Sequence, residues 1–167
     1  MVLLRLCKAA LVAAVALFFT LVAFGNVTDY GSNWEFVRHV LAMDTIFPNS
    51  TLTWRAITSV PLQTAGYVGI IATEAAAAAV LWFAAARMIA SLRGPTFEGA
   101  LTIAVAGLTL GFLLYAVGFV TIGGEWFAMW QSSTWNGQAK AFEFLSWIGI
   151  TMLIVLMPEP AAAQPGR

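Results

Sequence analysis

Four long apolar stretches decide what this chain can fold into. They run from about Leu6 to Phe24, Ala65 to Ala86, Ala100 to Ile122 and Ala141 to Met157. An α-helix needs roughly 20 apolar residues to cross a bilayer. Inside lipid the backbone must satisfy its own hydrogen bonds, and none of these stretches alternates polar and apolar residues as a barrel strand would. The sequence therefore predicts an all-α membrane protein, a single four-transmembrane-helix bundle over residues 1–157.

The composition supports a lipid-covered molecule and excludes several classes of site. Only 10% of the residues are charged, whereas soluble domains carry roughly 25%. The net charge of zero provides no field that would attract nucleic acid, so we expect no nucleic-acid partner. Cys7 and His39 are single residues of their kinds, which excludes a disulfide within the chain and a cysteine metal cluster. We expect no metal, no cofactor and no catalytic set.

The first apolar stretch has two interpretations. Arg5 and Lys8 before an apolar run are typical of a secretory signal peptide, and Ala23-Phe24-Gly25 is a weak cleavage site. The run is as long as a true span, however, and leads into further spans. We therefore predict that it stays as a transmembrane helix.

Basic residues predict the orientation, because Lys and Arg in short loops favour the cytoplasmic side. Five basic residues fall on the side of the termini: Arg5, Lys8, Arg87, Arg93 and Arg167. Three fall on the other side: Arg38, Arg55 and Lys140. Both termini are therefore predicted to be cytoplasmic. Residues 158–167 are rich in Pro and Ala and are predicted to be a disordered tail, and Arg93-Gly94-Pro95-Thr96 is predicted to be a tight turn.

The first outer loop is long enough to contain structure of its own. Ser32 and Glu35 match a capping box, and apolar residues follow at helical spacing. We predict a short interfacial helix from about Asn33 to Asp44 and a second short element around Thr53 to Thr58, which carries Trp54.

The second outer loop combines glycines and tryptophans. Gly123-Gly124 is expected to release the chain from the third span, Trp126 and Trp130 are spaced by one helical turn, and Asn136-Gly137 is a turn signal. Five of the seven tryptophans fall in the two outer loops. They indicate either an aromatic belt or a cap that binds a ligand or partner. The candidate cap residues are Asp29, Trp34, Arg38, His39, Asp44, Trp54, Arg55, Glu125, Trp126, Trp130, Trp135 and Asn136.

Glu74 lies near the middle of the second span, where a carboxylate is costly and should face the bundle interior. It is either a proton-active or cation-binding site, or a neutral acid hydrogen-bonded to Thr109 or Tyr115. Gly107 and Gly111 are a small-xxx-small pair, which favours close packing within the bundle or a homodimer.

The charged residues of the outer side allow two interpretations. They form either an ion-pair network between the two loops or a site for a polar solute. The set is Asp29, Glu35, Asp44, Glu125, Glu143, Arg38, Arg55 and Lys140. His39 is expected to be a packing residue, with a quinone hydrogen bond as the alternative.

The outer loops also carry a family resemblance. Asn26 to Tyr30, Asn33 to Asp44 with Phe47-Pro48, and above all Gly-Gly-Glu-Trp-Phe-Ala-Met-Trp-Gln at 123–131 with Trp135-Asn136-Gly137 resemble a bacterial family of predicted small integral membrane proteins. The resemblance covers about Leu6 to Met157. It implies four spans in a bacterial inner membrane, and it supplies no activity because the family's function is unknown.

Three functions remain open at this point. The first is a non-catalytic accessory or scaffold protein with a protein partner or second copy at the outer loops or the Gly107/Gly111 face. The second is a small proton-coupled transporter or channel that uses Glu74. The third is a membrane protein that binds a lipid, a quinone or a cofactor. The lipid bilayer is the expected partner in each case.

Overall fold

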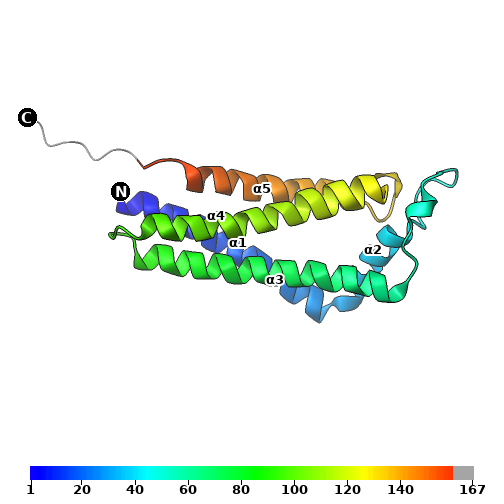
Figure 1. Ribbon diagram of the computed structural model, residues 1–167, viewed down its shortest axis with the longest axis horizontal. Helices are drawn as coiled ribbons and strands as arrows, with labels where there is room; N and C mark the ends of the chain where they lie inside the picture. The colour runs from blue at the N-terminus through cyan, green and yellow to red at the C-terminus, as the bar shows by residue number, and fades with distance from the viewer. Residues whose placement is uncertain (160–167) are drawn as a thin grey trace, which may run out of the picture.

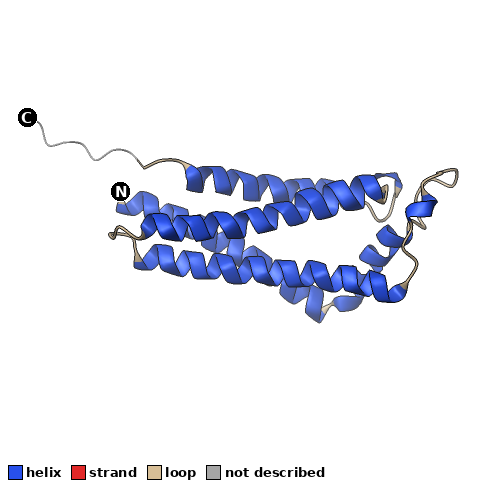
Figure 2. Cartoon of the chain, viewed as in Figure 1, coloured by secondary structure: helices blue, strands red, loops and turns tan. Residues whose placement is uncertain are grey.

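The computed structural model describes residues 1–159, which form helices and short loops and contain no strand (Figures 1 and 2). Within this range four helical segments are long and apolar enough to cross a membrane: Val2–Thr28, Val60–Ala90, Phe97–Trp126 and Gln138–Leu156. The predicted all-α fold with four spans is confirmed. The predicted tail falls, from residue 160 onward, outside the described residues.

The first two spans are longer than the apolar stretches that predicted them. Helix α1 runs Val2–Thr28 and helix α3 runs Val60–Ala90, so each helix extends beyond its predicted bounds at both ends. Pro61 lies in the first turn of α3, where its missing N–H has no partner to lose. The predicted turn also forms: the N–H of Gly94 donates to the carbonyl of Ser91 over 2.9 Å, between α3 and α4 (Phe97–Leu113).

Helices α1, α3, α4 and α5 (Gln138–Leu156) pack side by side around one apolar core (Figure 1). A Cβ on Gly111 would clash with the ring of Phe19 on α1, and one on Gly107 would lie 2.8 Å from Cγ of Leu81 on α3. The small-residue pair is therefore used for close packing inside the bundle, where backbones can approach only without side chains.

The third span continues through the two glycines that were expected to end it. Helix α4 passes into a π-helix, η2 (Leu114–Trp126), which includes Gly123 and Gly124. Gly124 is buried against Gln138, so its missing side chain serves close packing and not termination. The helix ends before Ala128, whose φ of 52° is left-handed. Trp126 and Trp130 consequently lie in different elements, and the predicted helical spacing between them is wrong.

The outer helix α2 (Tyr30–Ala42) forms but begins earlier than predicted. Ser32 therefore lies inside the first turn, where its Oγ donates to Oδ1 of Asp29 over 3.0 Å and not to the backbone. Glu35 accepts from Arg38, so the predicted capping box does not form. The predicted second element is the 3-10 helix η1 (Thr53–Arg55), and a third short helix, η3, spans Met129–Gln131.

Candidate functional site

Helix α2 lies at one end of the bundle (Figure 1). Two neighbouring cavities lie beneath it. The larger has a volume of about 270 Å³ and is walled mainly by apolar side chains of α2, α3 and η2. The smaller has a volume of about 160 Å³ and reaches Glu74. Both cavities are lined by Phe36, Val37, Ile70 and Phe119, so they share a wall. The two cavities together are termed the chamber.

The inner end of the chamber is polar. Glu74 is only 2% exposed, and its Oε2 accepts a 2.7 Å hydrogen bond from Nδ2 of Asn26 on α1. The hydroxyl of Tyr67 donates to the backbone carbonyl of Asn26 over 3.1 Å and lies 3.4 Å from its Oδ1. Among residues 1–159 no side chain or N–H donates to Oε1 of Glu74, which leaves this oxygen for the cavity that Glu74 lines.

The partners predicted for Glu74 are wrong. Thr109 is exposed and its hydroxyl lies 3.7 Å from the sulfur of Met152, on a different face of α4. Tyr115 is buried and lines the same small cavity as Glu74, but its ring packs among Phe19, Phe119 and Phe144 and its hydroxyl does not bond to the carboxylate. The hydrogen-bond partner is Asn26 of α1, a residue that the sequence pattern connects with the family resemblance and not with Glu74.

The two outer loops fold together into one lid, defined here as residues 30–58 with 127–137. The lid has its own small core of Val40, Met43, Phe127, Ala128 and Met129. Two polar contacts also join the loops: the hydroxyls of Thr45 and Ser132 lie 2.8 Å apart, and the N–H of Phe47 donates to Oε1 of Gln131 over 3.2 Å. The expected turn before α5 is present, since Oδ1 of Asn136 accepts from the N–H of Gln138 over 3.1 Å.

Ion pairs do not connect the two loops, contrary to the predicted network. Among the described residues of the outer side, each ion pair is local: Arg38 with Glu35, His39 with Glu35 and Asp44, and Lys140 with Glu143. The hydrogen bond from Arg38 lowers the pKa of the Glu35 carboxyl below its usual value. Glu125 meets only Gln138, at 3.4 Å.

Aromatic rings provide the contacts between the loops that ion pairs do not. The ring of His39 stacks on Trp135, with centroids 4.9 Å apart, so His39 packs against the second loop as expected. The Arg55 guanidinium lies 4.7 Å from the ring centroid of Trp126 and donates from Nη1 to its carbonyl. Trp34 stacks over Tyr30 next to Tyr67, at the rim of the polar end.

The most exposed tryptophan rings lie on the outer surface of the lid. Trp54 is 70% exposed and meets Trp126 edge-to-face, while Trp130 meets Phe47 in the same way. These rings are placed away from the chamber. The aromatic residues that line the chamber are instead Phe36, Phe119, Phe127, Phe144, Tyr67 and Tyr115.

The fold and the buried polar end define a helical integral membrane protein with four candidate spans and a lid at one end. The chain belongs to the family of predicted small integral membrane proteins, a domain family of unknown function, whose match covers residues 4–158. No curated protein and no solved structure matches the chain. The expected family membership is confirmed.

Proposed function

We propose that this protein is a non-catalytic membrane protein that binds one small amphipathic molecule in the chamber beneath the lid. The observation that carries the proposal is the position of Glu74. A carboxyl group this deep in a membrane protein is costly unless it has a partner, and it marks a functional site by default. Here one oxygen is bonded to Asn26, and the other is left at the wall of a cavity.

The shape and polarity of the chamber support an amphipathic ligand. Small-molecule sites are mostly apolar, with a few polar groups that fix orientation, and measure roughly 300–1,000 Å³. The apolar larger cavity and the polar smaller one together reach the lower end of that range. A lipid-derived or quinone-type molecule fits this pattern: its apolar part would lie between α2, α3 and η2, and its head would exchange a hydrogen bond with Glu74.

The packing of α3 below Glu74 supports a ligand-binding role for the chamber in preference to transport of a solute through the bundle. Ala77, Leu81 and Ala84 continue along α3 toward the opposite end, and all three are fully buried in the main core. A transporter or channel that uses Glu74 would need this packing to open. An accessory role, the first expectation from the sequence, is compatible with a protein that holds a ligand without transforming it.

Binding of defined probes tests the proposal. The probes are a quinone with a decyl side chain and dodecanol, and tryptophan emission reports binding because Trp135 packs on Phe36 of the chamber wall. Gly66 lines the larger cavity, whereas Gly69 on the same helix has no neighbour within 4 Å of its Cβ direction. We expect saturable binding of at least one probe that Gly66→Leu abolishes and Gly69→Leu preserves. Equal binding in both variants, or no saturable binding of either probe, would reject the proposal.

We further infer that the end with Met1 and the α3–α4 turn faces the cytoplasm of a bacterial inner membrane and that the lid faces outward. Arg5, Lys8, Arg87 and Arg93 belong to the first end, and the rule that basic loops stay inside supports this orientation. Arg167 lies outside the described residues.

A further inference from the structure

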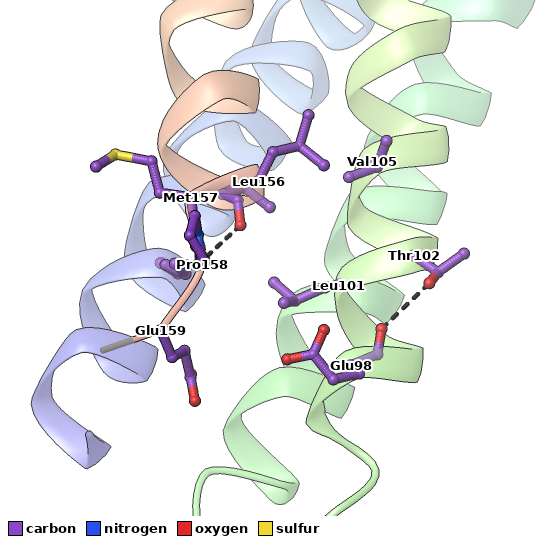
Figure 3. A pocket seen from close by; sticks show the side chains of 10 residues that line it. Glu98, Leu101, Thr102, Val105, Leu156, Met157, Pro158 and Glu159 are labelled. Carbon is purple, nitrogen blue, oxygen red and sulfur yellow. Dashed lines mark hydrogen bonds between the residues drawn. The ribbon is translucent and has the colours of Figure 1, made fainter. Parts of the chain in front are cut away.

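The end of the bundle opposite the lid contains a second cavity with charged groups at its rim. It has a volume of about 270 Å³ and lies between α4 and the end of α5. Figure 3 shows Glu98, Leu101 and Val105 of α4 on one side and Leu156 and Glu159 on the other. Glu98, Thr102 and Leu156 are exposed, so the cavity opens on the outer surface of the bundle.

The polarity of this cavity follows the polarity of a membrane leaflet. Leu101, Val105 and Val155 line it toward the middle of the bundle, while Glu98 and Glu159 lie at the end of the helices. The groove is apolar along its length and has charged groups where the spans end. This arrangement matches a phospholipid, whose acyl chain would lie along the groove and whose head group would lie at the rim. The lipid surrounds this surface in the membrane, so such a molecule needs no separate route of entry.

The two basic side chains at this cavity, Lys8 and Arg5, are already engaged with the protein. Lys8 is 1% exposed, and its ammonium donates to the carbonyls of Val155 and Met157 at the end of α5. These carbonyls have no partner within the helix, so the lysine caps it. Arg5 donates from Nε and Nη2 to the two oxygens of Glu159, at 2.7 and 2.8 Å. Its Nη1 donates to the carbonyls of Leu92 and Gly94.

The carboxylates of Glu98 and Glu159 are less fully engaged by protein groups than Lys8 and Arg5 are. Glu98 forms no ion pair with any residue among 1–159, and each oxygen of Glu159 keeps a lone pair beyond its bond to Arg5. The hydrogen bond from Arg5 lowers the pKa of the Glu159 carboxyl, so it remains ionised at neutral pH. Two carboxylates thus line the cavity from opposite sides at its charged rim, and the ammonium of Lys8, which also lines it, has one N–H beyond its two carbonyl partners.

We propose that this cavity binds a phospholipid whose head group carries a primary ammonium, with the ammonium on Glu98 and Glu159 and the acyl chain in the groove between α4 and α5. The ammonium donates hydrogen bonds to carboxylate oxygens. The adjacent phosphodiester accepts the remaining N–H of Lys8. A trimethylammonium head cannot donate these bonds, and a glycerol head brings no positive charge to the carboxylates.

Native mass spectrometry of the full-length protein tests this proposal. The protein is equilibrated in detergent with equal amounts of phosphatidylethanolamine, phosphatidylcholine and phosphatidylglycerol that carry the same acyl chains. We expect the ethanolamine lipid to be retained over the choline lipid by about threefold to tenfold, which is the net effect of one typical hydrogen bond. Equal retention of the three lipids, or a preference for the glycerol lipid, would overturn the proposal.

Two variants locate the effect. Glu98→Gln should remove the preference for the ethanolamine lipid, whereas Glu143→Gln, which changes an exposed carboxylate near the lid, should keep it. A preference that survives Glu98→Gln would contradict the assignment. Thermal unfolding provides a second readout: added ethanolamine lipid should raise the Tm of the wild type and of Glu143→Gln but not of Glu98→Gln. These outcomes do not depend on the chamber at the opposite end, so failure here leaves the proposed function untouched.

Discussion

Nδ2 of Asn26 donates a 2.7 Å hydrogen bond to Oε2 of Glu74, and this contact joins α1 to α3 directly beneath the lid. It places the one acidic side chain buried within residues 1–159 at the inner end of a cavity. Asn26→Ala should therefore leave Glu74 without its partner and lower the free energy of unfolding by about 1 kcal/mol, the scale of hydrogen bonds between membrane helices.

A double-mutant cycle checks that the loss comes from this pair. Unfolding in detergent is measured for Asn26→Ala, Glu74→Ala and the double variant. Because the two single changes remove the same hydrogen bond, the double variant should lose less than their sum. Strictly additive losses would show that the two side chains do not interact.

Gly111 should resist substitution more than a glycine elsewhere on α4. Gly111→Ala pushes a methyl group into the ring of Phe19 and should cost about 1–3 kcal/mol through overpacking. Gly99, with nothing within 4 Å of its Cβ direction, is the matched control, and Gly99→Ala should cost nothing. If Gly111 instead contacts a second copy of the chain, size-exclusion chromatography of Gly111→Ala will show a change of oligomeric state, which our assignment does not predict.

The lid should open more readily than the bundle because it has a small core of its own. Hydrogen exchange should be faster in residues 30–58 and 127–137 than in the buried parts of α1 and α3. Ser132→Ala removes the contact with Thr45 and an acceptor for the N–H of Trp135. Exchange should then rise within the lid alone. Uniform exchange across lid and bundle would show that they open as one unit.

Acid should weaken the attachment of α1 to the end of α5. Glu159 has a lowered pKa in the folded protein, so its bond to Arg5 stabilises the fold above the ordinary glutamate pKa of about 4.5 and is lost as the pH falls through the folded value. The Tm of the wild type should therefore decline below about pH 4.5 more steeply than that of Glu159→Gln. Parallel pH profiles for the two proteins would refute a contribution from this pair.

Cysteine labelling tests the proposed orientation. Cys7 is the single cysteine, so Cys7→Ser provides a background without thiols. In intact cells a membrane-impermeant maleimide should label Asn49→Cys in the lid and should label Gly94→Cys only after lysis. The reverse pattern would invert the orientation.

The number and positions of the four spans and the existence of α2 could be predicted because they depend on local composition. The partner of Glu74 could not be predicted, because it depends on which faces of α1 and α3 pack against each other. From the sequence, Lys8 was interpreted only as a basic residue that sets the orientation in the membrane. In the structure its ammonium also caps the end of α5. The expected network between the loops fails because long charged side chains on a helix first reach neighbours three or four residues away, as Arg38 does with Glu35 and Lys140 with Glu143.

The π-helix was outside the reach of sequence patterns for a different reason. The residues of Leu114–Trp126 do not show whether this segment forms π-helical or α-helical turns, because either helix would present an apolar surface. As a sequence pattern Gly123-Gly124 predicts the end of the span, although packing against Gln138 makes glycine necessary at position 124 inside the helix. Tyr115 and Phe119 of η2 line the chamber, so this irregular segment shapes the candidate site.

The most direct measurement is the identity and amount of what co-purifies with the native protein. Mass spectrometry of solvent extracts from the wild type, Gly66→Leu and Gly69→Leu, purified alike, separates a bound molecule from bulk lipid. The account predicts one amphipathic compound at about one per chain in the wild type and in Gly69→Leu, and its depletion in Gly66→Leu, whose side chain fills the larger cavity. Identical extracts from all three proteins, with bulk lipid alone, would contradict it.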